Sequence, residues 1–156
     1  MKFNLNLTDM KKLMLLLVLV LFAKVKSNAQ SDDVIGVWLT FEEKSQVRIF
    51  KATNGKYYGK IAWLKEDKEE KDSNNPDLSL RDKPLMEMII LKGFSYNKDK
   101  EYWDGGTIYD PKNGKTYDCF MWFEDDMQKL EIKGYVLGMK FIGRTTTWKR
   151  EDAVRE

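Results

Sequence analysis

The sequence predicts an all-β protein that folds as one eight-stranded, antiparallel, up-and-down barrel. Three observations predict this class: short apolar segments recur between turn residues, two of these segments show clear alternation between their two faces, and glycines stand inside most of them. Hairpin turns join neighbouring antiparallel strands, and glycine permits the sharp bends that a closed barrel needs. A sandwich of the same strands is the alternative, but closure removes the exposed sheet edges.

The first 29 residues precede the strands and are typical of a cleaved secretory signal peptide. Lys11 and Lys12 stand before an unbroken apolar run, 13–23, and Ser27-Asn28-Ala29 offers a small-x-small cleavage site. The run is shorter than the roughly 20 residues that span a bilayer, which disfavours an uncleaved anchor; a buried core helix is the third option. We expect cleavage before Gln30 and a periplasmic or secreted protein, with no cysteine placed to carry a lipid anchor.

Cleavage also reverses the formal charge of +2, which arises from 27 basic and 25 acidic side chains. Residues 1–29 hold five lysines and one aspartate, so their removal leaves 22 basic and 24 acidic groups. A near-neutral chain of mixed charges gives no electrostatic reason to expect a nucleic-acid partner. The remaining residues, 30–156, suit a single β-barrel domain, which we expect to be a monomer without a stable membrane span.

The strands follow one another with chemically specific turns between them. We expect them at 34–41, 46–52, 57–64, 88–96, 101–109, 115–123, 128–136 and 141–149. Asn54-Gly55 and Asn113-Gly114 are strong hairpin signals, because both residue types tolerate positive φ. Leu130, Ile132 and Gly134 share one face of their strand, as expected for a sheet with one buried side.

The segment 65–87 interrupts this pattern between the third and fourth strands. It begins with a charged run that has no apolar periodicity, so we expect 65–75 to be solvated and mobile. Asp77 is placed to cap a short helical turn, with Arg81 one turn later as its ion-pair partner. The segment is either a plain surface excursion or a lid over the barrel mouth.

The residues that are absent exclude several kinds of chemistry. The chain has no histidine and one cysteine, Cys119, so a histidine-activated nucleophile and a zinc site built from His and Cys are excluded. Cys119 is in phase with Tyr117 and Met121, which favours a buried thiol on an apolar strand face. We expect no metal and no cofactor, and an enzyme only if carboxylates, tyrosine or arginine suffice for its chemistry.

Aromatic residues are the more suggestive part of the composition. Five Trp and seven Tyr fall after residue 29, and most lie on expected strands. Such side chains suit a core and also a partly apolar pocket, because their polar tips require hydrogen bonds when buried. The candidates for ligand binding are Tyr57, Trp63, Tyr117 and Trp122, of which Tyr117 and Trp122 lie on opposite faces of one strand.

Two motifs mark the first and last strands, which are neighbours in a closed barrel. Gly36-Val37-Trp38 opens the first strand, and Arg144 lies in the last. We expect Arg144 to lie over the Trp38 indole as a cation–π pair and to close one end of the barrel. This arrangement resembles the Gly-x-Trp motif of lipocalins and related calycins, in which that Trp packs with a basic residue of the final strand.

A closer resemblance covers nearly all of 34–149. The motifs that carry it, in order, are Val34-Ile35-Gly36-Val37-Trp38, Gly55-Lys56-Tyr57-Tyr58-Gly59-Lys60-Ile61, Asn75-Pro76-Asp77 with Leu80-Arg81, Pro84-Leu85, Leu91-Lys92-Gly93-Phe94, Gly105-Gly106-Thr107-Ile108-Tyr109-Asp110-Pro111, Asn113-Gly114-Lys115-Thr116-Tyr117 and Gly143-Arg144-Thr145. This series resembles a family of small secreted bacterial proteins catalogued as domain of unknown function 2147. The resemblance implies a lipocalin-like barrel in the bacterial envelope and brings no catalytic residues.

Three functions remain compatible with these observations. The first is a secreted or periplasmic barrel that binds one small apolar or amphipathic ligand, because an eight-stranded barrel is just wide enough to hold one. The second is an envelope interaction module with a filled barrel, which meets a protein or a glycan through its surface. The third is a histidine-free enzyme.

Overall fold

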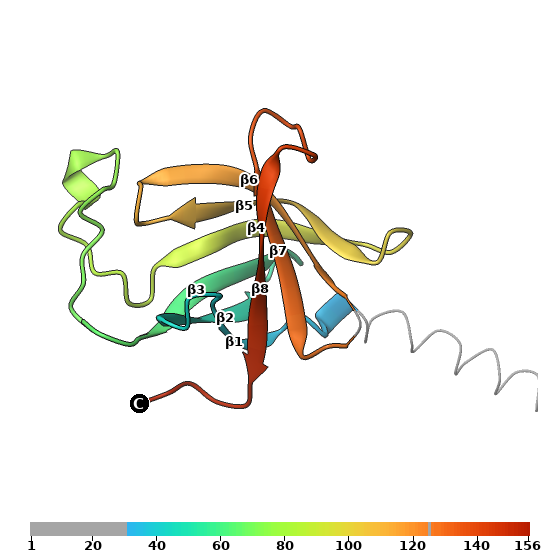
Figure 1. Ribbon diagram of the computed structural model, residues 1–156, viewed down its shortest axis with the longest axis horizontal. Coiled ribbons are helices and arrows are strands. Elements are labelled where there is room, and N and C mark those ends of the chain that lie inside the picture. The colour runs from blue at the N-terminus through green and yellow to red at the C-terminus, as the bar shows by residue number, and fades with distance from the viewer. Residues whose placement is uncertain (1–30, 125) are drawn as a thin grey trace, which may run out of the picture. The chain divides into compact units, whose positions relative to one another are not determined.

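Eight antiparallel strands close into a barrel in the computed structural model, which describes residues 31–124 and 126–156 (Figure 1). In chain order the elements are β1 Gly36–Leu39, β2 Ser45–Lys51, β3 Tyr57–Leu64, the 3-10 turn η1 Leu78–Leu80, β4 Ile89–Asn97, β5 Tyr102–Asp110, β6 Lys115–Phe123, β7 Lys129–Tyr135 and β8 Gly143–Glu151. Each strand pairs with the next, and β8 pairs with β1. The predicted fold class is confirmed, whereas the predicted signal peptide, 1–29, lies outside the described residues.

The turn residues act as their chemistry predicts. Gly55 and Gly114 follow Asn in two hairpins and adopt φ of 77° and 68°, a region in which a side chain is strained. Asn54 and Asn113 each accept a hydrogen bond through Oδ1 from the backbone N–H two residues later. The hairpins therefore form where local sequence specifies them, and all eight strand ends fall within two residues of the prediction.

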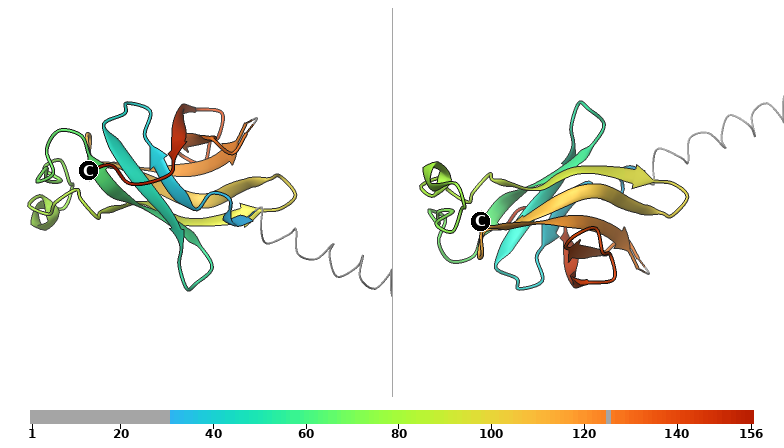
Figure 2. Two further views of the ribbon diagram at one scale, coloured as in Figure 1. Left: turned by 90° about the horizontal axis from the view of Figure 1, so that it is seen from below. Right: turned by 90° about the horizontal axis from the view of Figure 1, so that it is seen from above.

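The up-and-down topology separates two ends of the barrel. The β1–β2, β3–β4, β5–β6 and β7–β8 connections lie at one end, here called the mouth, and the β2–β3, β4–β5 and β6–β7 turns lie at the other, the closed end. Figure 2 shows the long β3–β4 connection with η1 on one side of the molecule and the β4–β5 turn on the opposite side. Among the described residues, no helix has the length and hydropathy needed to cross a bilayer.

Aromatic side chains fill the closed end. Trp103 is buried in contact with Tyr57, Tyr96 and Phe123, with ring centroids 4.9–6.4 Å apart. Phe123 also packs against Trp38, which is fully buried and donates its indole N–H to the Val34 carbonyl over 2.9 Å. These large side chains leave little space in this half of the barrel, because each buries a large apolar surface.

Arg150, and not Arg144, covers the Trp38 indole. The Arg150 guanidinium lies 4.2 Å from the ring centroid, and it donates hydrogen bonds to the Ile35 and Met127 carbonyls. The expectation for Arg144 is wrong because the β1–β8 register places Trp38 opposite Arg150. Gly36 has φ of 148°, and a Cβ there would lie 2.9 Å from the guanidinium, so glycine both permits this backbone and leaves room for Arg150.

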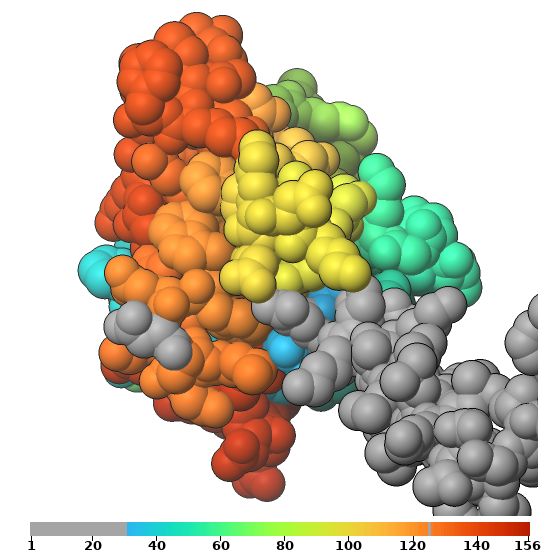
Figure 3. All heavy atoms as spheres, turned by 90° about the vertical axis from the view of Figure 1, so that its right-hand side faces the viewer, coloured from blue at the N-terminus to red at the C-terminus, as the bar shows by residue number. Residues whose placement is uncertain are grey.

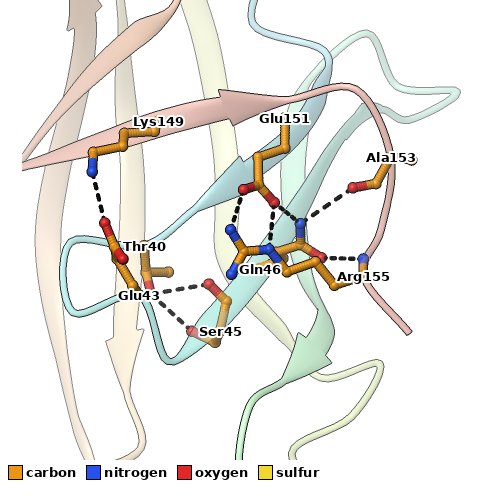
Figure 4. Close-up of polar contacts among 8 residues, drawn as sticks. All are labelled: Thr40, Glu43, Ser45, Gln46, Lys149, Glu151, Ala153 and Arg155. Carbon is orange, nitrogen blue, oxygen red and sulfur yellow. Dashed lines mark hydrogen bonds and ion pairs between the residues drawn. The ribbon is translucent and has the colours of Figure 1, made fainter.

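The seam that closes the barrel is short and is reinforced by side chains. β1 and β8 share three residue pairs. Beside them, the buried Gln46 carboxamide bonds to Glu151 and to the backbone of Ala153 and Arg155, and Lys149 pairs with Glu43 (Figure 4). These contacts hold β2 and the C-terminal segment against β8 where the ladder itself is brief.

Candidate functional site

A cavity of about 640 Å³ occupies the mouth half of the barrel. All four mouth connections and the inner faces of several strands contribute to its lining. The volume falls within the range of small-molecule sites, about 300–1,000 Å³. The mouth half is therefore hollow, in contrast to the filled closed end.

The depth of the cavity is apolar. Inward-facing aliphatic residues and one tryptophan line it: Ile61, Leu64, Leu85, Ile90, Ile108, Ile132 and Trp148. Strand alternation explains part of this set, because residues two apart along a strand face the same side, as Trp148 and Thr146 do on β8. Gly134 of β7 also lines the cavity, and a Cβ there would make ordinary van der Waals contact with Ile108 and Tyr117, whose nearest atoms would lie 3.5–3.6 Å away.

The rim of the cavity is charged, and much of its charge is paired. Lys112 of the β5–β6 turn bonds to Glu42 of the β1–β2 loop, and Lys44 lies 3.4 Å from Glu66. The hydrogen bond from Lys112 lowers the pKa of Glu42 below its ordinary value, so this pair stays ionised at neutral pH. Arg144 also lines the rim and is exposed. The rim thus presents equal numbers of acidic and basic side chains around an apolar interior.

A buried carboxylate anchors the β3–β4 connection at the mouth. Asp72 is fully buried, and it accepts hydrogen bonds from the Tyr109 hydroxyl over 2.7 Å and from the Asn75 carboxamide over 2.5 Å. Its backbone N–H donates to Lys83, and the Asn74 side chain bonds to the β5–β6 turn. Residues 65–71 are exposed, as predicted for a solvated segment, but the connection is fixed at its middle.

The short helical turn in this connection is partly as predicted. Asp77 caps η1, since its carboxylate accepts from the backbone N–H of Ser79 over 2.9 Å. Arg81 does not serve as the partner of Asp77: its Nε donates to the Asn75 carbonyl over 2.8 Å. Arg81 therefore ties η1 to the backbone of the preceding part of the connection, which adds rigidity next to Asp72.

One side of the cavity wall is incomplete. β8 pairs with β7 over Gly143–Lys149 but with β1 only over Lys149–Glu151. Within the part of the chain that the structure describes, no strand pairs with residues 143–148 on the β1 side. The cavity reaches this stretch, because Gly143 and Thr146 line it together with Phe41 of the β1–β2 loop. A ligand can therefore reach the interior beside residues 143–148 of β8.

The structure brings one of the four predicted ligand-binding residues to the cavity. Tyr117 lines it, and the hydroxyl of Tyr117 accepts a hydrogen bond from Asn113 over 3.1 Å. Trp122 lies on the opposite face of β6, stacked on Phe120 with centroids 5.1 Å apart. Tyr57 is buried in the aromatic core of the closed end. Of the four predicted residues, only Tyr117 is thus placed to contact a ligand in this cavity.

Trp63 is displaced from the interior by a bulge in β3. The β2–β3 register shifts between Gln46 and Val47, so Val47 pairs with Ile61 and Gln46 with Trp63. The extra residue moves Trp63 to the face that carries Gln46. There its indole N–H donates to the backbone of Glu156, and the Arg155 guanidinium lies 5.3 Å from its ring. The alternation assumed from sequence is wrong at this one step.

Cys119 is a buried thiol of the core, as predicted. It is fully buried, and burial raises the pKa of the thiol above its ordinary value, so it remains protonated and unreactive. Across residues 31–124 and 126–156, no group of three or more His, Cys, Asp or Glu side chains is arranged to hold a metal ion.

Sequence reasoning missed the residues that shape the mouth. Asp72 and Tyr109 are 37 positions apart and meet only through the fold. Leu85 and Ile90 line the cavity from the end of the connection and the start of β4, where no alternation was visible. Ile132 and Gly134 carried a usable signal, because the period-two pattern of β7 already placed them on the inner face.

A barrel of this topology, closed at one end and hollow at the other, is a lipocalin-like barrel. The chain belongs to the family described as "Uncharacterized protein conserved in bacteria (DUF2147)", whose sequence model matches residues 36–150.

Among solved structures, the chain is similar to Protein HP1028 from the human pathogen Helicobacter pylori, which is described as belonging to the lipocalin family. The two are 27% identical with a TM-score of 0.67, and the match covers 76% of this chain and 83% of that chain. Among curated proteins, none matches this chain significantly.

Proposed function

We propose that this protein binds one small, partly apolar ligand in the mouth cavity and carries it. The observation that supports the proposal is one cavity of about 640 Å³ with an apolar depth and a polar rim. Such a site matches a ligand with an apolar body and a polar end, because the body gains by leaving water while the end remains hydrated. A barrel that served only as an interaction module would have no need of this hollow.

The polar end of the ligand has defined neighbours at the rim. Tyr117 and Arg144 both line the cavity. A tyrosine hydroxyl donates and accepts, and a guanidinium donates only, so the two accommodate an oxygen-bearing group. The ligand is therefore expected to place its apolar body against Ile108, Ile132 and Trp148.

Gly134 offers a direct test, because it lines the cavity and a Cβ at this position would not clash with the backbone. Gly134→Leu is expected to fill part of the cavity while the barrel stays folded. Titration with the neutral probe N-phenyl-1-naphthylamine, followed by energy transfer from Trp148, should show saturable one-site binding in the unchanged protein. Binding by Gly134→Leu should be at least about tenfold weaker, which corresponds to 1.4 kcal/mol.

Lys133→Leu is the matched control. Lys133 neighbours Gly134 on the same strand and is not part of the cavity lining, so its substitution adds the same leucine outside the cavity. It should leave the affinity for the probe unchanged. The proposal is wrong if the unchanged protein does not bind the probe, or if the two variants weaken binding equally.

We further propose that the protein works outside the bacterial cytoplasm, as a monomer, after removal of residues 1–29. The basic, apolar and small-residue regions of this segment support export. Cell fractionation with N-terminal sequencing should find the protein in the periplasm or medium and beginning at Gln30. Light scattering should give the mass of one chain. A cytoplasmic protein that begins at Met1 would contradict the first expectation.

A further inference from the structure

Large apolar side chains are exposed at the cavity mouth. Leu137 and Phe141 are 85% and 80% exposed in the β7–β8 loop, and Phe41 is 58% exposed in the β1–β2 loop. Val136 and Ile142 flank the first two and are also exposed. Figure 3 shows the β7–β8 loop, in orange-red, projecting at the top beyond the strands.

This apolar surface is continuous with the cavity. Phe41, Val136 and Ile142 line the cavity as well as facing solvent. They stand next to the stretch of β8 that β1 does not cover. Apolar side chains therefore extend from the tip of the loop to the lining of the cavity.

The presence of leucine at position 137 is not explained by the stability of the turn. Leu137 and Gly138 have φ of 55° and 69°, and the Met139 N–H donates to the Val136 carbonyl over 3.0 Å, as in a type I′ turn. Asn-Gly is the favoured sequence of this turn, because a leucine at positive φ is strained. A strained and exposed leucine indicates a role outside the folded chain.

The charges around the mouth balance, because the residues that line the cavity include four acidic and four basic side chains. Lys140 lies 2.7 Å from Asp104, Lys112 bonds to Glu42, and Lys44 lies near Glu66. The mouth thus offers little net charge to a strongly charged partner. It fits a surface that is apolar beneath a neutral headgroup layer, where side chains such as Leu and Phe insert at the acyl boundary.

We propose that the β7–β8 loop and Phe41 dock the mouth on a zwitterionic lipid surface, so that an apolar ligand passes directly between the lipid phase and the cavity. This rests on the proposed carrier function, because a lipid phase is where an apolar ligand is stored. A protein partner seated on the same loops would cover the route into the cavity. The docking is driven by apolar contact and is therefore insensitive to salt.

A local fluorescent label tests the docking. Cys119 is fully buried, so a cysteine introduced by Phe141→Cys is the one accessible thiol in the described part of the full chain. An environment-sensitive dye at this position should shift to the blue when phosphatidylcholine vesicles are added, at low and at high salt. The same dye at Met127→Cys, a residue 53% exposed in the β6–β7 turn at the closed end, should not shift.

A second variant links docking to transfer. Leu137→Asn with Phe141→Ser removes the apolar tip and supplies the Asn-Gly turn that the backbone prefers, so the fold should be retained. Its affinity for N-phenyl-1-naphthylamine in solution should be unchanged. Its rate of uptake of the probe from phosphatidylcholine vesicles should fall at least about tenfold, as expected when two large apolar side chains are lost from the lipid contact. Met127→Asn, which removes an exposed apolar side chain at the closed end, is the control and should transfer at the original rate.

The outcomes separate the two proposals. A dye at position 141 that does not shift, or that shifts no more than the dye at position 127, overturns docking and leaves the cavity proposal intact. A shift that depends on protein concentration without vesicles identifies a second copy as the occupant and also overturns it. A shift on vesicles without any probe binding in solution supports docking and overturns the carrier function.

Discussion

Asp72 shows how one side chain can fix a long connection. Its carboxylate is fully buried within a segment that is otherwise largely exposed, and its two oxygens accept hydrogen bonds from Tyr109 and Asn75. A buried carboxylate is stable only when such partners replace water. Tyr109 also lines the cavity, so this single contact joins the connection to the wall of the site.

Tyr109→Phe should lower the free energy of unfolding by about 1–3 kcal/mol, because the Asp72 carboxylate then loses one of its donors. Chemical denaturation at pH 7 measures this change. Hydrogen exchange should show faster opening of residues 70–85 than of β2, whose contacts are untouched. Uniform acceleration over both segments would contradict the anchoring role of Asp72.

The same contact predicts a dependence on alkaline pH. Burial, and then the hydrogen bond to Asp72, raise the pKa of Tyr109 to about 12. Because the folded-state pKa is raised, the contribution to stability is complete below the ordinary tyrosine pKa of about 10 and is lost as the pH rises through about 12. Denaturation curves between pH 9 and about 12 should show this loss in the unchanged protein. In Tyr109→Phe the slope over the same interval should be smaller.

Arg150 and Arg144 provide a matched pair on β8. Arg150→Ala removes a cation–π contact with Trp38 and two hydrogen bonds to carbonyls, and should destabilise the protein by about 2–3 kcal/mol. Arg144→Ala removes an exposed rim residue and should stay within about 0.5 kcal/mol. Thermal melting of both variants tests whether Arg150, and not Arg144, stabilises the barrel over Trp38. A larger loss of stability in Arg144→Ala than in Arg150→Ala would reject this assignment.

At the level of elements, glycines decide where the strands can bend and approach. Gly106 of β5 lies against the Phe94 ring of β4, and a Cβ there would meet ring atoms at 2.5 Å. Gly134 of β7 has ordinary van der Waals room. The β5–β6 register shift between Trp103 and Gly106 coincides with Gly105 at φ of 73°, which marks a bulge where the sheet curves.

Gly106→Ala should therefore destabilise the barrel by about 1–3 kcal/mol, the usual effect of overpacking a core. Gly134→Ala should change stability by no more than about 0.5 kcal/mol. Both substitutions are chemically identical and both positions lie in strands, so the comparison isolates local packing. Equal effects in urea denaturation would show that strand propensity, not the Phe94 contact, sets the loss.

At the level of the whole molecule, the barrel is filled at one end and hollow at the other. The aromatic core around Trp103 supplies packing, and the mouth cavity supplies space for a ligand. Loops are where function usually concentrates on a rigid scaffold, and here all four mouth connections contribute to one cavity. Packing at the closed end therefore stabilises a barrel whose mouth half is less densely filled.

A ligand of this cavity should stabilise the whole barrel. At a free concentration of 100 times Kd, the free energy of unfolding should rise by about 2.7 kcal/mol, because the ligand binds only the folded state. N-phenyl-1-naphthylamine should therefore raise the melting temperature of the unchanged protein. Gly134→Leu, if it binds at least about tenfold more weakly, should gain no more than about 1.4 kcal/mol at the same probe concentration, and an increase equal to that of the unchanged protein would place the probe elsewhere.

Local sequence determined the β class, the eight strands and the tight turns. Asn-Gly pairs and period-two alternation act between neighbours along the chain, so the positions of hairpins such as Asn54-Gly55 are readable without tertiary structure. The inner face of β7 and the buried thiol of Cys119 follow from the same alternation. The Gly-x-Trp motif likewise located the closed end through Trp38.

Tertiary structure alone decided which distant residues meet. The β1–β8 register selects Arg150 over Arg144, a bulge turns Trp63 out of the interior, and folding brings Asp72 to Tyr109. None of these can be read from local sequence: strand register places each side chain on one face or the other, a shift of one residue moves it to the opposite face, and Asp72 and Tyr109 lie 37 positions apart. The cavity has the same origin, because its volume is the space left after all eight strands have closed.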